Sequence, residues 1–264
     1  MSSRSLLAAT GLFVALVFTG CQSATPLQQA KATKTAEELL SQAITKSQET
    51  KSYHFTMNMT MGLDMGGMNM TLPMEGAGDY VAPDKMRLSM EMKAPMQMKV
   101  EMINIGTQAF VKNPGSDEWK EVDARENSPL PVSPADTALF FKGKPDRVED
   151  LGRDNVQGTP VRHIGYTLDD TALKALNVHF EKTSGASLSK ARLEVWVGES
   201  DAQMYRFLLD GAMDMTIPGS GLTTAVKANL KLDMGMSDFN SPMNIQAPTG
   251  VRATSFSSGV PTVR

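Results

Sequence analysis

The sequence predicts an α+β fold in which one strongly curved antiparallel sheet carries a few helices on its apolar face. Long stretches of the chain alternate strictly between apolar and polar residues, which is typical of antiparallel strands with one dry face and one wet face. Helix start signals occur at only three places along the chain. Several alternating stretches exceed the usual strand length of about five or six residues, and long strands favour a sheet that curls.

The first helix is predicted to begin after Thr35, because the sequence Thr35-Ala36-Glu37-Glu38 fits a capping box. In this motif the cap hydroxyl accepts a hydrogen bond from the backbone at position 38, while the Glu38 side chain reaches back to the cap. A modest apolar stripe runs through residues 40–47, and the chain turns extended at Lys51.

The segment from Tyr53 to Tyr80 is predicted to be a hairpin that turns at Gly66-Gly67. Primed two-residue turns need a positive φ, which glycine adopts without strain. Such a turn pairs residues whose numbers sum to about 133, so Met61 faces Leu72. In this register apolar residues lie opposite apolar residues along the whole hairpin. They have odd numbers in the first strand and even numbers in the second. Turn chemistry and side-chain pattern therefore predict the same register.

Alternation predicts further strands after the hairpin. Met86–Met92 and Met96–Met102 are joined by Lys93-Ala94-Pro95, and a three-residue turn keeps Met92 and Met96 on one face. The remaining strand candidates are residues 109–112, 118–122, 161–168, 192–198, 204–217 and 223–236.

Two more helices are predicted in the second half of the chain. Ser133 as cap, Pro134 at the first position and Gly143 after the end frame a short helix at residues 135–142. Asp169 or Asp170 caps the other, in which Leu173, Leu176 and Phe180 line one side.

Residues 1–20 are predicted to be a lipoprotein signal peptide. Basic Arg4 precedes an apolar run from Leu6 to Phe18, which suits a signal peptide but is too short to span a bilayer comfortably. The run Phe18-Thr19-Gly20-Cys21 resembles the lipobox of bacterial lipoproteins, which implies an acylated Cys21. An ordinary secretory signal is the alternative, but it leaves the only cysteine of the chain unpaired in an oxidising compartment.

The rest of the chain reads as one domain between two flexible ends. Residues 21–34 comprise the acylated cysteine and a small, polar tether, and residues 249–264 are a Ser/Gly/Pro-rich tail predicted to be disordered. Residues 35–248 are long enough for a single domain with a large core. A net charge of −3 without a basic stripe argues against a nucleic-acid partner.

Methionine is concentrated in the predicted hairpin and the strands that follow it, because 13 of the 20 methionines lie between Met57 and Met102. One hypothesis is a Cu(I) site, since thioethers are soft ligands; its candidate ligands are Met57, Met59, Met61, Met68 and Met70. Leucine and valine fill the same series of positions, however, and His54 lies on the opposite face. A methionine-filled core or an adaptable surface around acyl chains is favoured instead. Gly76 and Gly78, opposite Met57 and Phe55, leave room for a bend or a ligand.

Catalysis finds little support in the sequence. The three histidines, His54, His163 and His179, share no motif. Ser187-Leu188-Ser189-Lys190 fits S-x-x-K, but the companion motifs of penicillin-recognising enzymes do not follow in usable order. We therefore expect a protein that is not an enzyme and needs no cofactor.

The order of these segments resembles a known group. A lipobox, a tether, a helix ending in KSYHF and the meander PDKMRLSMEMKAPMQMKVEMINIGTQAFVKNPGSDEWKEV are similar to the LppX/LprG-type bacterial lipoproteins and related methionine-rich lipoproteins. GTPVRHIGYTLD, ARLEVWVGES and MSDFNSPMNIQAP resemble the same family's later strands. The resemblance implies a LolA-like half-barrel with helices over its concave face, a cavity for acyl chains, and the binding or carrying of lipids in the cell envelope. Cys21 is the residue that carries over by motif.

These observations together predict a lipoprotein anchored on the extracytoplasmic face of a bacterial membrane, which binds or carries a hydrophobic ligand. Its expected partners are the membrane, an acyl chain and an envelope transport protein. The alternatives are a Cu(I)-binding envelope protein and a structural or sensory lipoprotein with a filled core. The residues expected to line the ligand cavity are Tyr53, Phe55, Met57, Met59, Met61, Met70, Met90 and Met98, with Leu139, Phe140 and Phe141 near its mouth.

Overall fold

The computed structural model describes residues 34–251, except residues 65–66, 95–96, 113, 124–137, 142–147, 185 and 216–225. The described residues belong to one compact unit. The predicted signal peptide, Cys21 and all of the tether before Lys34 lie outside them, as do residues 252–264 of the predicted tail.

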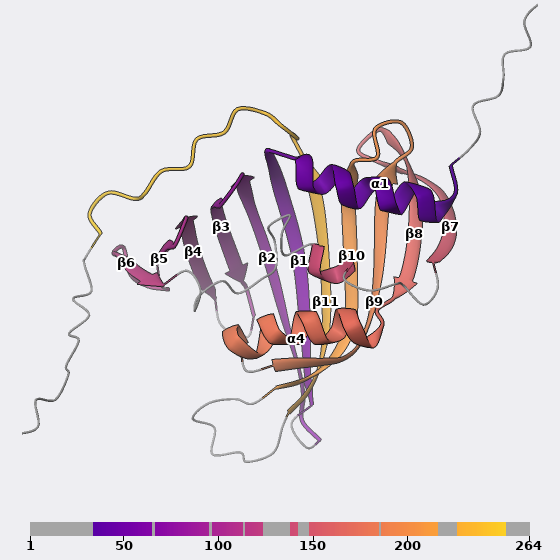
Figure 1. Cartoon of the computed structure of the whole chain (residues 1–264). Helices are drawn as coiled ribbons and strands as arrows, with labels where there is room; N and C mark the ends of the chain where they lie inside the picture. Colours follow the sequence, from indigo (N-terminus) through magenta and orange to yellow (C-terminus); the bar gives the residue numbers. More distant parts are fainter. Residues whose placement is uncertain are drawn as a thin grey trace, which may run out of the picture. The chain divides into compact units, whose positions relative to one another are not determined.

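Eleven strands form one antiparallel sheet in the order β6-β5-β4-β3-β2-β1-β11-β10-β9-β8-β7 (Figure 1). Neighbours in the sheet are neighbours in the chain except at one place, where the first strand pairs with the last. The strands are β1 (Ser52–Asp64), β2 (Asn69–Val81), β3 (Lys85–Met92), β4 (Met98–Ile105), β5 (Gln108–Lys112), β6 (Trp119–Asp123), β7 (Val148–Val156), β8 (Thr159–Thr167), β9 (Ala186–Gly198), β10 (Met204–Met215) and β11 (Val226–Ser237).

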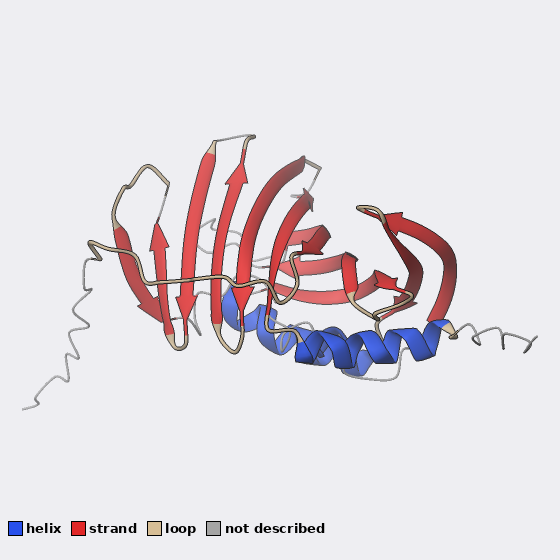
Figure 2. Ribbon diagram, turned by 90° about the horizontal axis from the view of Figure 1, so that it is seen from above, coloured by secondary structure: helices blue, strands red, loops and turns tan. Residues whose placement is uncertain are grey.

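The described helices lie on the concave side of this curved sheet (Figure 2). They are α1 (Ala36–Glu49), the 3-10 helix η1 (Ala138–Phe141) and α4 (Asp170–Ser184). Helix α4 packs on β9 and η1, while α1 packs on β7, β8, β9 and η1. The predicted fold class, an antiparallel curved sheet with few helices, is confirmed. None of the described helices is both long and apolar enough to cross a membrane.

Helix α1 begins at the predicted capping box. The Glu38 backbone N–H donates to the Thr35 hydroxyl at 3.2 Å, and the Thr35 backbone N–H donates to the Glu38 carboxylate at 3.0 Å. Leu39, Leu40 and Ala43 bury the inner face of the helix. The two reciprocal bonds satisfy backbone donors that the helix itself leaves unpaired.

The hairpin register predicted from the sequence is confirmed. Met61 pairs with Leu72, Met59 with Met74 and Tyr53 with Tyr80, so the paired residues sum to 133 along the whole ladder. Gly67 has a φ of 107°, as a turn glycine should, whereas Gly66 lies outside the described residues. The odd residues of β1 and the even residues of β2 therefore share one face, which we call the apolar face; the other is the polar face.

The predicted turn after Met92 is wrong in length. Met92 pairs with Met98, so the connection comprises the five residues 93–97 rather than three. Residues 95 and 96 lie outside the described residues. The observed register differs from the predicted one by two residues, so every side chain of this pair of strands stays on its predicted face.

Two elements differ from the sequence-based prediction. Strand β7 is absent from that prediction, because its sequence VEDLGRDNV is polar and a bulge at Gly152 interrupts its pairing; edge strands need no apolar alternation. Within the predicted helix at residues 135–142, only residues 138–141 are described, and they form a 3-10 turn.

Most of the core lies between the apolar face and the helices, but a second cluster lies on the polar face. Ile245, from the segment after β11, packs there against Ile103 and Phe110. Val251 joins this cluster, so the first residues of the predicted tail lie against the sheet.

Candidate functional site

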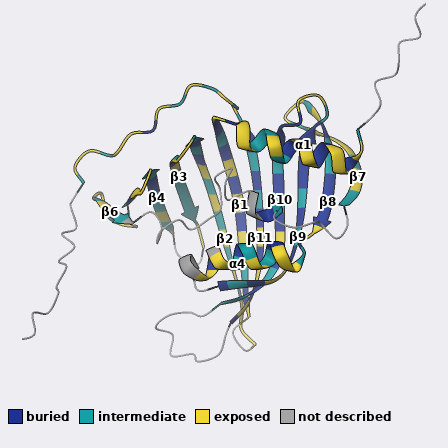
Figure 3. Ribbon diagram, viewed as in Figure 1, coloured by how far each residue is buried: buried dark blue, intermediate teal, exposed yellow. Residues whose placement is uncertain are grey.

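The apolar face changes character across the sheet (Figure 3). On β9–β11 its side chains are buried; Leu193, Leu209 and Leu232 are at most 1% exposed. On β1–β4 part of it is only half-buried, and the described helices pack mainly on β7–β9. We call this part the methionine face; it comprises Met61, Met70, Leu72, Met74, Met90, Met92, Met98 and Val100.

The predicted lining residues divide into two groups. Tyr53, Phe55, Met57 and Met59 are buried in the core, with at most 8% of each residue exposed. The half-buried group comprises Met61, Met70, Met90 and Met98, which belong to the methionine face. The side chain of Leu139 lies outside the described residues.

Phe140 and Phe141 line a cavity of about 80 Å³ between α1, η1, β8 and α4. Its other walls are Leu40, Ile44, Tyr166, Leu168, Asp169 and Ala172. The Tyr166 hydroxyl donates a long, 3.5 Å hydrogen bond to the Phe140 carbonyl, and burial raises the pKa of Tyr166 well above its ordinary value. The cavity is thus a mainly apolar space with one phenol, Tyr166, and one carboxylate residue, Asp169, in its wall.

Gly76 and Gly78 leave room on the apolar face, as the sequence indicates, but side chains of the chain itself fill that room. A Cβ atom at Gly76 would lie 2.9 Å from Cγ of Met57, and one at Gly78 would lie 2.5 Å from Cζ of Phe55. Each glycine therefore receives the residue opposite it on β1.

Asn104, on β4, places an unusual polar group on the apolar face. It pairs with Met86 on β3 and Ala109 on β5, both buried. Its Oδ1 is the buried side-chain atom without a hydrogen-bond partner in the described part of the chain. An unmade hydrogen bond of this kind costs about 1–3 kcal/mol.

Each described histidine side chain lies against a carboxylate on the polar face. The Nδ1 atom of His54 lies 2.8 Å from Asp79, and Nε2 of His163 lies 2.9 Å from Glu194. The side chain of His179 is outside the described residues. No group of three or more His, Cys, Asp or Glu side chains that would suit a metal ion occurs among the described residues. Met68, one of the candidate copper ligands, lies one residue before the start of β2 and is 70% exposed.

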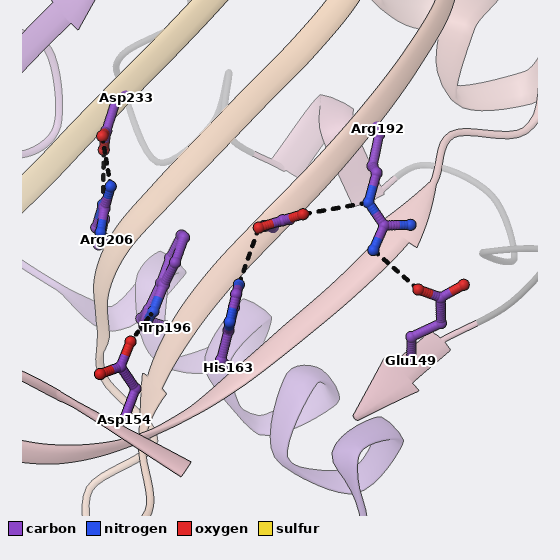
Figure 4. A network of polar contacts seen from close by, with 8 residues as sticks. Glu149, Asp154, His163, Arg192, Trp196, Arg206 and Asp233 are labelled. Atoms are coloured by element: carbon purple, nitrogen blue, oxygen red, sulfur yellow. Dashed lines mark hydrogen bonds and ion pairs between the residues drawn. The ribbon is translucent and has the colours of Figure 1, made fainter. Parts of the chain in front are cut away.

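A network of charged side chains covers the polar face of β7–β11 (Figure 4). Arg192 donates to Glu149 at 2.8 Å and to Glu194 at 3.2 Å, and Glu194 in turn contacts His163. The sequence gives no signal for this network, since its members are scattered over five strands and look like ordinary solvated charges.

Trp196 forms the centre of the same surface. The His163 ring stacks on it with centroids 4.1 Å apart, and the Arg206 guanidinium lies 4.3 Å from its centroid. Its indole N–H donates to Asp154 at 2.9 Å, while Arg206 Nε donates to Asp233 at 2.7 Å. Trp196 is therefore shielded on the polar face without a second layer of structure.

Asp79 on the polar face is expected to make stability depend on pH. Burial alone would raise its pKa, but hydrogen bonds from His54 and Arg87 and their charges lower it. A depressed pKa stabilises the fold above the unfolded-state value of about 3.9, and this contribution disappears as the pH falls through the folded-state value. Asp79→Asn should therefore lower the melting temperature at pH 7 and lower it less at pH 3. An equal loss at both pH values would show that the carboxylate charge is not the cause.

Comparisons with known proteins address the fold. LprF from Mycobacterium bovis aligns over 81% of this chain and 96% of its own, with 11% identity and a TM-score of 0.51. The lipoprotein LppX from Mycobacterium tuberculosis aligns over 80% of this chain and 100% of its own, with 15% identity and a TM-score of 0.51. The chain has the LprF/LppX fold. This agrees with the resemblance found in the sequence.

Other comparisons add less. A LolA superfamily protein from Nitrosomonas europaea aligns over 78% of this chain and 94% of its own, with 12% identity and a TM-score of 0.28. Residues 35–134 match a family described as of unknown function, DUF6612. No curated protein sequence matches the chain. The structural comparison thus supports the LprF/LppX fold. It assigns no roles to individual residues, because the sequence identity is only 11–15%.

Proposed function

We propose that this protein is a membrane-anchored envelope lipoprotein that binds the acyl chain of a lipid on its methionine face. The observation that carries the proposal is the half-buried apolar surface on β1–β4, beside a fully buried surface on β9–β11 of the same sheet. Contiguous apolar surface that stays accessible is a mark of ligand binding. Acylation of Cys21, as the lipobox resemblance implies, would hold this surface near the membrane.

The size of the cavity beneath the helices supports placing the acyl chain on the methionine face. The space beneath the helices measures about 80 Å³, whereas an engineered cavity that binds benzene measures about 150 Å³. An acyl chain therefore does not fit in that space alone, and the methionine face is the larger apolar surface. Ten methylenes buried there would contribute about 8 kcal/mol before the loss of ligand freedom is subtracted.

The chemistry of the face suits acyl chains of varying shape. Methionine has three rotatable bonds and adapts to irregular partners, and six of the eight side chains of the methionine face are methionine.

Native mass spectrometry of the chain with Cys21→Ser tests the proposal. We expect copurified lipid, or uptake of a long-chain fatty acid in a ratio near one per chain. A chain that carries no lipid and takes up none would contradict the proposal and favour a structural or sensory role.

A pair of charge substitutions locates the site. Met90→Glu places a carboxylate on the methionine face, and we expect it to weaken binding of a fluorescent fatty acid at least about tenfold, because a desolvated charge is unfavourable beside an acyl chain. Ser89→Glu is the matched control, since it adds the same charge to the neighbouring residue on the polar face. Equal effects of the two substitutions would mean that the ligand does not lie on the methionine face.

A further inference from the structure

Four methionines form a straight row across the apolar face. Met59 pairs with Met74, Met74 pairs with Met92, and Met92 pairs with Met98, so the row crosses β1, β2, β3 and β4 without a gap. Met59 is 8% exposed, and the other three are half-buried. This methionine row is not evident from the sequence, because it depends on the pairing of Met92 with Met98.

The same row of the sheet continues with leucine on the other side of β1. Met59 pairs with Leu232 on β11, Leu232 with Leu209 on β10, and Leu209 with Leu193 on β9. The methionines on β1–β4 and the leucines on β9–β11 lie on the same face of one sheet. Core packing alone therefore requires the same kind of apolar side chain at both sets of positions. Leucine meets that need on three strands. The change to methionine on the next four strands brings two properties that leucine lacks, a flexible unbranched side chain and a thioether sulfur.

Strand spacing allows neighbouring sulfurs in the row to share one ion. Adjacent strands lie about 4.7–4.9 Å apart, and side chains at directly opposite positions have Cβ atoms about 4.5–5.5 Å apart. Two sulfurs bound to one ion at about 2.3 Å, the length of a zinc–sulfur bond, are at most about 4.6 Å apart. The row lies on the apolar face, which also carries the main core of the described residues. Three flexible methionines on consecutive strands meet these distances.

We infer that the methionine row binds a soft monovalent cation, Cu(I) or its analogue Ag(I). The ligands are the neutral thioether sulfurs of three of its four methionines. Thioethers select Cu(I) over hard cations and over metals that prefer imidazole or carboxylate. The neighbouring row on the same face is Met57, Gly76, Met90 and Val100, so it offers no nitrogen or oxygen side-chain ligand. His54 lies on the polar face, paired with Asp79. The site therefore shares only Met59 with the copper site considered from sequence, whose other candidate ligands were Met57, Met61, Met68 and Met70.

Anaerobic titration with Cu(I) tests this inference. The chain with Cys21→Ser is used, so that no thiolate competes, and a chromogenic Cu(I) chelator reports the affinity. We expect about one Cu(I) per chain, and at least a tenfold weaker affinity in the double variant Met74→Leu, Met92→Leu. Leucine conserves volume and apolar character, so the double variant should keep the melting temperature of the parent.

The matched control is Met204→Leu with Met213→Leu, which removes two buried thioethers from β10. The control should bind Cu(I) like the parent. Equal affinity of the parent and the Met74/Met92 variant, or equal losses in both double variants, would overturn the inference. X-ray absorption of the parent loaded with Cu(I) provides a measurement that does not depend on variants: a shell of sulfur alone supports the site, and a shell of nitrogen or oxygen overturns it.

Discussion

Replacing Gly78 with alanine is expected to lower the free energy of unfolding by about 1–3 kcal/mol or more. The added Cβ would lie 2.2 Å from the carbonyl oxygen of Arg87 and 2.5 Å from Cζ of Phe55. The first contact is with backbone, so the β2–β3 ladder itself has to move. The second pushes a fully buried ring, at 0% exposure, out of its place in the core.

Gly62→Ala is the control for this substitution. Gly62 also lies in a long strand of the same hairpin, but a Cβ there would meet nothing closer than the Asn229 carbonyl at 4.0 Å. Thermal and urea unfolding measure both variants. For a domain of this size each kcal/mol lowers the melting temperature by about 2–4 °C, so Gly78→Ala should melt several degrees below Gly62→Ala. Similar melting temperatures would mean that Phe55 does not occupy the space above Gly78.

Local signals in the sequence are sufficient for the hairpin. Gly66-Gly67 specifies a two-residue turn, and the switch from odd to even apolar residues allows one register only, so the sequence alone places Met59 opposite Met74. The capping box at Thr35 is equally local, since both of its hydrogen bonds connect residues three apart.

Pairing between distant strands cannot be predicted in the same way. The contact of β1 with β11 joins residues far apart in the chain, such as Met59 and Leu232, and neither strand carries a turn that specifies its partner. Alternation gives the face of each residue but not its neighbour across the ladder. For this reason the sequence assigns the methionines to one face, whereas the methionine row is visible only with the register.

The methionine face links the two proposed ligands. An acyl chain and a soft cation both favour thioether-rich surface, but for different reasons: the first uses the flexibility of the side chain and the second uses its sulfur. Substitution of methionine by leucine removes the sulfur but conserves the apolar character of the face. It therefore acts most strongly on cation binding, whereas a charge at Met90 would disturb both.

Replacing Phe140 with alanine is expected to lower the free energy of unfolding by about 3–5 kcal/mol. Phe140 is 1% exposed, lies with its ring centroid 5.9 Å from that of Phe207 and forms one wall of the cavity beneath α1 and α4. Its removal joins the volume of the ring to the existing space of about 80 Å³. The surrounding strands are held in a ladder and relax only partly, so most of the new cavity persists.

The same substitution should change what the cavity accepts. An apolar cavity larger than about 150 Å³ binds benzene-sized molecules, so Phe140→Ala should regain part of its lost stability in the presence of benzene, whereas the parent should not respond. Val178→Ala on α4 is the control, because Val178 is 57% exposed and its truncation should change stability by no more than about 0.5 kcal/mol. Urea unfolding with and without benzene measures both effects. A loss below about 1 kcal/mol at Phe140 would contradict the buried position of its ring, and a large loss without any response to benzene would mean that the helices close over the space.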